Sequence, residues 1–278
     1  SVDVANSALG AEVKDVVITC PAYFGDAERL ATANAGRIAG FNVMEVIKEP
    51  LAAAIYFGAT KASENKTYMV FDLGGGTFDV TIMRISEDTI EEICSDGDHW
   101  LGGKDWDDKL INYLKSQFAE EIGMEVDFSA EEEQELRLAA EKAKKNLTGK
   151  TSTAVAVNAA GERRRIEVTR AIFDELTSVE RDRTFDITDR AIASARAKGV
   201  EVDEILLVGG STLMPQIKEA IVAKYGIEPR SHDPSEAVAK GAALYAAWYY
   251  IEMRKKIKCG ICGRALSECS CDPNAPAE

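Results

Sequence analysis

Three consecutive glycines separate two strand-like segments in the first third of the chain. The stretch FDLGGGTFDV covers residues 71–80, and the segments at 67–70 and 79–85 are rich in apolar and β-branched residues. This pattern predicts a β-hairpin with the glycines in its turn. Glycine weakens a strand because it adds backbone entropy and has no side chain to pack. Three together therefore indicate that another group must come very close to the backbone.

A phosphate chain is the simplest group that needs such access. Several backbone N–H groups of a glycine turn can point at one anion, and no Cβ blocks its approach. Asp72 and Asp79 would repel that anion unless a cation lies between, and Mg²⁺ bridges carboxylates to phosphates while keeping several waters. Thr77 could donate its hydroxyl to a terminal phosphate or to an attacking water. The alternative is a tight hairpin with a flexible tip. The Walker pattern is absent here, so the turn is not a P-loop of the usual kind.

Charge and hydropathy narrow the class of protein. The 278 residues include 33 lysines and arginines against 47 acidic residues, a formal net charge of -14. This charge argues against a nucleic-acid backbone or an anionic membrane as partner. No apolar run is long enough to span a bilayer, and no signal peptide opens the chain at Ser1. We therefore expect a cytoplasmic protein, present here as a fragment or a processed form.

Strands and helices alternate in the first part of the chain. Residues 13–20 predict a buried strand, followed by a turn and a helix to residue 40, a strand over 42–50 and a helix over 51–60. This order indicates a parallel sheet with crossover helices. Residues 61–66 are polar and are expected to link this part to the second half.

The second half begins with the glycine hairpin. The pattern then predicts a strand at 89–100, a helix at 105–123 and a charged helix at 129–149 with Ser129 as N-cap. Further along, it predicts a hairpin at 151–170, one or two helices at 171–199, a buried strand at 204–210 and helices at 215–226 and 235–256.

Two more glycine pairs are candidates for the same ligand. Gly209 and Gly210 follow a buried strand and precede a helix, a context in which N–H groups and the helix dipole gather an anion or a nucleotide. Gly102 and Gly103, in LGGKDWD, would also let a ligand approach closely. Each pair alone fits an ordinary turn, but together with the first turn they favour a divided nucleotide pocket.

Six segments occur in a fixed order between about residues 8 and 250. They are VVITCPAYFGDAERLATANAGRIAGFNVMEVIKEPLAAAIYFG, VFDLGGGTFDVTI, LGGKDWD, EKAKKNLTG, ILLVGGSTLMPQI and DPSEAVAKGAAL. Together they resemble the nucleotide-binding domain of DnaK-type chaperones, the heat shock protein 70 family, whose relatives include actin and the sugar kinases. The resemblance implies an α/β, actin-like (ribonuclease H-like) ATPase fold of two lobes, with the first lobe incomplete.

The resemblance also implies a division into domains. Residues 1–60 would form the partial first lobe, and residues 61–258 the second lobe, with a helix-hairpin insert at about 128–185. Residues 259–278 would form a cysteine-rich tail. ATP or ADP would bind in the cleft between the lobes.

Site residues follow from the resemblance one by one. Asp72, Thr77 and Glu49 would be catalytic, with Asp72 and Glu49 holding Mg²⁺ through its waters. The nucleotide-binding residues would be Gly74, Gly75, Gly76, Thr77, Gly102, Gly103, Glu141, Lys144, Lys145, Thr148, Gly209, Gly210, Ser211 and Leu213. Residues three, four and seven apart are neighbours on a helix surface, so four of these lie on one face of the charged helix: Glu141, Lys144, Lys145 and Thr148.

The chain also departs from the family pattern. The family's first phosphate loop, a Gly-Thr-Thr hairpin, and the lysine that assists the attacking water have no counterpart in these residues. Catalysis of phosphoryl transfer depends on positioning and charge, so we expect weak ADP binding and little ATP turnover. Lys145 and Leu213 replace arginines, and Leu51 replaces a threonine.

Four cysteines lie close together near the C-terminus. Cys259 and Cys262 form a C-x-x-C pair, and Cys269 and Cys271 a C-x-C pair. Four thiolates at this spacing suit a tetrahedral zinc ion, and disulfide pairs are the alternative.

We expect an ATP- or ADP-binding, Mg-dependent domain of a chaperone whose parent protein hydrolyses ATP during protein folding. Its partners would be nucleotide, with co-chaperones or nucleotide-exchange factors. One alternative is a non-catalytic actin-like interaction module with a zinc-binding tail. A sugar kinase or actin-like filament protein is another, but the segments IKEPLAAA and EKAKKNL argue against it.

Overall fold

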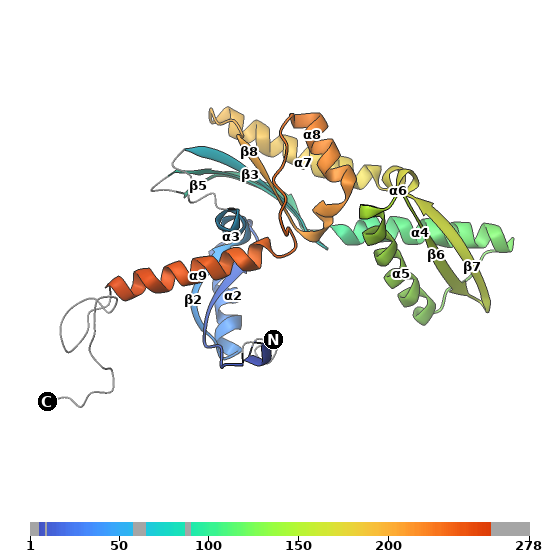
Figure 1. Cartoon of the computed structure of the whole chain (residues 1–278), viewed down its shortest axis with the longest axis horizontal. Helices are drawn as coiled ribbons and strands as arrows, with labels where there is room; N and C mark the ends of the chain where they lie inside the picture. Colours follow the sequence, from blue (N-terminus) through green and yellow to red (C-terminus); the bar gives the residue numbers. More distant parts are fainter. Residues whose placement is uncertain (1–5, 9, 58–64, 87–89, 257–278) are drawn as a thin grey trace. The chain divides into compact units, whose positions relative to one another are not determined.

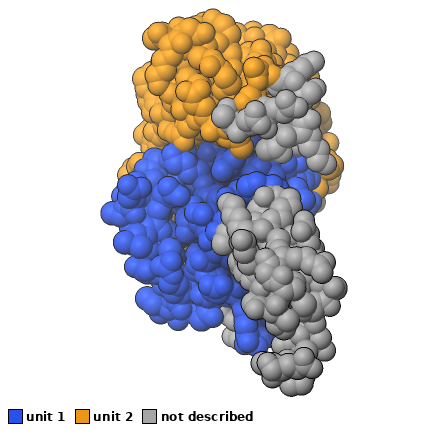
Figure 2. Space-filling model, turned by 90° about the vertical axis from the view of Figure 1, so that its left-hand side faces the viewer, with its two compact units in different colours: residues 1–58, 238–278 blue, residues 59–237 orange. Residues whose placement is uncertain are grey.

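The computed structural model describes residues 6–8, 10–57, 65–86 and 90–256 (Figure 1). The chain divides into two compact units, which Figure 2 colours separately. Unit 1 comprises residues 1–58 and 238–278, and unit 2 comprises residues 59–237. The domain limits predicted from the sequence stay a prediction, but the α/β class is confirmed by helices and several sheets in the described residues.

Unit 1 is built on a parallel pair of strands. Strand β1 (Asp15–Cys20) and strand β2 (Asn42–Lys48) are joined by helix α2 (Asp26–Ile38), as the sequence predicted. The expectation of a fully buried first strand was wrong, since only Cys20 of β1 is buried. Among the described residues β1 has a single neighbouring strand, so most of its side chains keep some contact with solvent.

Helices α3 and α9 complete the described part of unit 1. Helix α3 (Glu49–Tyr56) begins two residues earlier than predicted, because Pro50 fits the first turn of a helix, where its missing N–H is not needed. Helix α9 (Ala237–Lys256) contacts α3 at Gly241, where a Cβ would lie 1.8 Å from the carbonyl oxygen of Ala52. The backbones of the two helices are therefore in close contact at this point.

The sheet of unit 2 has the strand order β5-β4-β3-β8. The strands are β3 (Lys66–Leu73), β4 (Phe78–Ile85), β5 (Ile90–Asp98) and β8 (Glu204–Val208). The first three are antiparallel neighbours in chain order, which confirms the predicted glycine hairpin between β3 and β4. Strand β8 pairs with β3 in parallel, so their carboxyl ends lie at the same edge of the sheet.

Helix α7 (Ser178–Ala197) packs against this sheet, and other helices of unit 2 pack with a second hairpin (Figure 1). Ser129 caps helix α5, as predicted: its hydroxyl accepts from the N–H of Glu132, whose carboxylate accepts from the N–H of Ser129. The predicted hairpin turns at Ala160 and Gly161, both with positive φ. The elements are α4 (Gly103–Ile122), α5 (Ala130–Gly149), β6 (Ser152–Ala159), β7 (Glu162–Thr169), α6 (Arg170–Leu176), α7 (Ser178–Ala197), the 3-10 helix η2 (Gly210–Leu213) and α8 (Pro215–Tyr225).

Candidate functional site

The glycine turn between β3 and β4 contacts the other two glycine loops directly. The carbonyl oxygen of Gly74 accepts hydrogen bonds from the N–H of Gly103, at 2.9 Å, and from the hydroxyl of Ser211, at 2.9 Å. The N–H of Gly74 donates to the carbonyl of Thr77 at 3.0 Å and closes the turn. Three loops that are far apart in sequence thus meet at one residue.

Helix α4 begins against this turn. The N–H of Lys104 donates to the carbonyl oxygen of Gly75 at 2.9 Å, so the first turn of α4 uses acceptors from the hairpin tip. Gly102 must be glycine, because a Cβ there would lie 2.5 Å from the backbone nitrogen of Gly76. The sequence predicted that Gly102 would allow close approach of a ligand. In the structure the group that approaches it is the glycine turn itself.

The N–H groups of the turn remain open. Among the described residues, no acceptor takes a hydrogen bond from the N–H of Gly75, Gly76 or Thr77. A Cβ added at Gly75 or Gly76 would have no atom within 4 Å, so nothing else in the described chain fills this space. A turn whose carbonyls are bound and whose N–H groups face open space is suited to hold an anion.

Asp72 lies beside this turn at the end of β3. It pairs with Asp79 on β4 and with Val208 on β8 in the sheet register. Gly209 follows Val208 with φ +85°, and a Cβ there would lie 2.2 Å from the carbonyl oxygen of Leu73 and 2.8 Å from Oδ1 of Asp72. The carboxyl group of Asp72 therefore lies against the start of the third glycine loop, where only glycine fits.

Lys144 connects helix α5 to the start of α4. Its ammonium group donates to the carbonyl of Gly103 at 2.8 Å and to Oδ2 of Asp107 at 2.8 Å. Burial raises the pKa of Asp107, although the hydrogen bond from Lys144 acts in the opposite direction. Sequence reasoning missed Asp107. Its only signal was its place in LGGKDWD, four residues after Gly103.

The other predicted residues of α5 are more exposed than Lys144. Lys145 and Glu141 form an ion pair of 2.7 Å at the surface, which lowers the pKa of Glu141. The hydroxyl of Thr148 donates to the carbonyl of Lys145 at 2.7 Å. In the third loop Ser211 is buried, whereas the side chain of Leu213 is 50% exposed.

Glu49 belongs to unit 1, where it is the first residue of α3. Burial raises the pKa of its carboxyl group. The described residues contain no group of three or more His, Cys, Asp or Glu side chains arranged to hold a metal ion. The predicted zinc ligands Cys259, Cys262, Cys269 and Cys271 lie outside the described residues.

No helix in the described ranges combines the length and the apolar character that a membrane crossing needs.

Glycine loops gathered at the carboxyl ends of sheet strands, with open N–H groups, are typical of α/β proteins that bind phosphate groups. The family model described as Hsp70 protein matches residues 2–256. The chaperone protein DnaK of Thermotoga petrophila is 43% identical over 251 residues, as is that of Thermotoga maritima; each match covers 87% of this chain. DnaK of Thermosipho africanus is 41% identical over 250 residues.

The chain therefore belongs to the Hsp70 family, as the resemblance in its sequence predicted. It spans 42% of the length of these DnaK relatives.

Proposed function

We propose that this chain belongs to the nucleotide-binding domain of an Hsp70-type chaperone. Unit 2 would hold the phosphates of ADP or ATP at the turn formed by residues 74–77. The observation that carries the proposal is the set of open N–H groups at Gly75, Gly76 and Thr77. Family membership supports an actin-like, ribonuclease H-like fold of two lobes. The parent protein would couple ATP hydrolysis to protein folding and work with co-chaperones in the cytoplasm.

The nucleoside would lie against α5 and the third glycine loop. Ser211 lies against the start of α4, where a Cβ added at Gly103 would be 2.3 Å from its hydroxyl oxygen, and this hydroxyl donates to the carbonyl of Gly74. The side chains of Glu141, Lys145 and Thr148 would contact the sugar and base from the exposed face of α5, and Leu213 would cover the base from the other loop. Lys144 would position Gly103, since its ammonium group already binds that carbonyl. Gly102 and Gly209 keep the loops at backbone contact with each other.

The carboxylate of Asp72 would hold a Mg²⁺ ion through water, because hard oxygen ligands suit this ion and it keeps much of its hydration shell. The resemblance in sequence implies the same role for Glu49. When bound, the ion would neutralise charge on the phosphate oxygens. Asp72 would orient a water molecule beside the turn, with Thr77 as a donor to the terminal phosphate. Glu49, whose pKa is raised by burial, would be a further catalytic carboxylate, as the resemblance in sequence implies.

Gly75→Ala tests the phosphate site without disturbing the fold. The new methyl group meets open space in the protein, so the free energy of unfolding should stay unchanged. It would nevertheless lie where a phosphate must approach the backbone. We expect the Kd for Mg-ADP, measured by isothermal titration calorimetry, to rise about tenfold or more, as loss of a charge-assisted hydrogen bond or two would cause. The Kd for adenosine should change little.

Gly149→Ala is the matched control. Gly149 also has open space around its Cβ position, at the end of α5, and is not part of the proposed site. Its substitution should leave both Kd values unchanged. Equal weakening of ADP and adenosine by Gly75→Ala, or no weakening of ADP at all, would contradict phosphate binding at this turn.

A further inference from the structure

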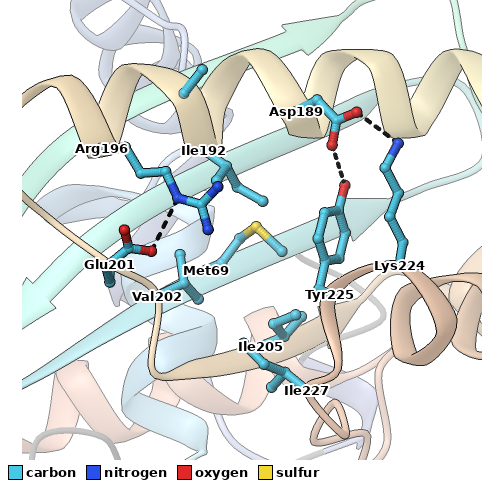
Figure 3. A pocket seen from close by; sticks show the side chains of 11 residues that line it. Met69, Asp189, Ile192, Arg196, Glu201, Val202, Ile205, Lys224, Tyr225 and Ile227 are labelled. Atoms are coloured by element: carbon cyan, nitrogen blue, oxygen red, sulfur yellow. Dashed lines mark hydrogen bonds and ion pairs between the residues drawn. The ribbon is translucent and has the colours of Figure 1, made fainter.

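A cavity of about 420 Å³ lies in unit 2 between β3, α7, β8 and the end of α8 (Figure 3). Its floor is Met69 on β3 and Ile205 on β8, which are partners in the parallel register and are buried. Met69 precedes the glycine turn by five residues, roughly 16 Å along a strand. The cavity is therefore separate from the proposed nucleotide site, and nothing in the proposed function uses it.

Part of the cavity wall is apolar and partly open to solvent. Ile192, Val202 and Ile227 line it and pack against the core of unit 2, but each is only partly buried. A ligand with an apolar body would remove this remaining apolar surface from water, which is favourable. The volume falls within the range of about 300–1,000 Å³ that is usual for small-molecule sites.

The rim of the cavity carries two ion-paired clusters. Asp189 uses both carboxylate oxygens, since Oδ1 accepts from the hydroxyl of Tyr225 at 3.0 Å and Oδ2 pairs with Lys224 at 2.6 Å. Burial raises the pKa of Tyr225, so its hydroxyl stays a neutral donor. At the other end of the cavity, Nε of Arg196 donates to Glu201 at 3.0 Å.

Arg196 keeps free donors at this rim. Among the described residues no acceptor takes a hydrogen bond from its two terminal guanidinium nitrogens. In Figure 3 the guanidinium group of Arg196 is turned toward the cavity. A guanidinium group with free terminal N–H groups matches the two oxygens of a carboxylate. The unused hydrogen-bonding capacity at this end is therefore suited to an acid.

The length of the cavity sets the size of its ligand. Asp189 and Arg196 are seven residues apart on α7, which corresponds to roughly 10 Å along the helix axis. We propose that this cavity binds a small carboxylic acid with a ring or branched apolar body, its carboxylate on Arg196 and its body over Met69, Ile205 and Val202.

The test compares two probes of the same size and carbon skeleton, one a carboxylate and the other a neutral amide. 3-Phenylpropionate and 3-phenylpropionamide are titrated into the full chain, and the methyl signals of Met69, Ile192, Ile205 and Ile227 are followed by NMR. A probe of about eleven non-hydrogen atoms should bind the site with a Kd of about 1 mM. We expect the methyl signals of these four residues to shift with the acid, and the amide to bind at least about fivefold more weakly because it forms no charge-assisted pair.

Arg196→Gln should remove the preference for the acid and leave binding of the amide unchanged. Arg190→Gln is the matched control, because Arg190 is on the same helix and pairs with Asp96 in the same way without lining the cavity. Ala193→Trp places a large side chain at the exposed edge of the cavity and should abolish binding of both probes. Equal binding of acid and amide, shifts confined to other methyl groups, or retained binding in Ala193→Trp would overturn the proposal.

Discussion

At the level of single residues, side chains that are neighbours in the sequence can differ greatly in burial. Lys144 and Lys145 are neighbours, and both were expected to contact the nucleotide. The side chain of Lys144 is only 11% exposed and bonds to Gly103 and Asp107. That of Lys145 is 70% exposed and pairs with Glu141, one turn earlier on the helix. Lys144 is therefore part of the contact between α4 and α5, because its ammonium group neutralises a buried carboxylate.

Lys144→Met should destabilise unit 2 strongly. It leaves the Asp107 carboxylate without its cation, and Oδ1 of Asp107 is already buried without a hydrogen-bond partner in the described residues. Removing one member of a buried pair costs about 3 kcal/mol or more in the free energy of unfolding. Urea denaturation followed by circular dichroism measures this difference.

Lys145→Met is the control for this prediction. Its ion pair is at the surface, so the expected change is below about 0.5 kcal/mol. The double variant Asp107→Asn, Lys144→Met should recover part of the stability lost in Lys144→Met, since it no longer buries a charge. Similar effects of the two lysine substitutions would mean that the buried pair adds no more stability than the surface pair.

At the scale of secondary structure, helix α5 begins where its local chemistry requires. The hydroxyl of Ser129 and the carboxylate of Glu132 satisfy each other's backbone N–H groups. Glu132 also accepts from the N–H of Ala160, which ties the start of α5 to the turn between β6 and β7. These bonds to the carboxylate lower the pKa of Glu132. One local motif thus sets both a helix start and the position of a hairpin.

Ser129→Ala should destabilise unit 2 by about 1 kcal/mol, because the N–H of Glu132 loses its acceptor at the helix end. The bond from Ser129 N–H to Glu132 should survive, since it uses the backbone alone. Urea denaturation again provides the measurement. Ser116→Ala, at an exposed position inside α4, is the control and should be neutral or slightly stabilising. If Ser116→Ala lowered the free energy of unfolding as much as Ser129→Ala does, the loss of the helix cap would not explain the effect.

At the scale of the whole molecule, the two units have very different cores. Among the described residues, the buried clusters that lie in unit 1 are small, formed by Cys20, Ala33 and Val46 and by Ile47, Ala52 and Ala242. Most of the buried apolar residues of unit 2 belong to one continuous cluster that runs from the sheet into α4, α5, α7 and the second hairpin. Stability grows with the apolar surface that folding buries, so the two units should not be equally stable.

Unfolding should therefore occur in two steps, with unit 1 first. Hydrogen exchange followed by mass spectrometry at increasing urea should show loss of protection in β1 and β2 before β3 and β4. Gly241→Ala should move only the first step to lower urea, because its methyl group would collide with Ala52 inside unit 1. A single step that includes all four strands, shifted as a whole by Gly241→Ala, would show that the units unfold together.

Local patterns and ordered motifs were enough to predict the secondary structure and the family. Hairpins at 71–80 and 151–170, the start of α5 at Ser129 and the order of strands and helices follow from periodicity, glycine turns and capping residues, all of which act over a few positions. The six motifs in order identified the Hsp70 family, which the comparisons confirm. The early start of α3 was the kind of boundary that such patterns place least well.

Only the tertiary structure decided which distant groups meet. The bond between Ser211 and Gly74 joins residues 137 positions apart, and the contact of Lys144 with Asp107 joins residues 37 positions apart. The cavity beside Met69 likewise depends on the packing of α7 and α8 against the sheet. No local pattern encodes such contacts, because they depend on how the helices pack on the sheet and on the volume that the core side chains leave free.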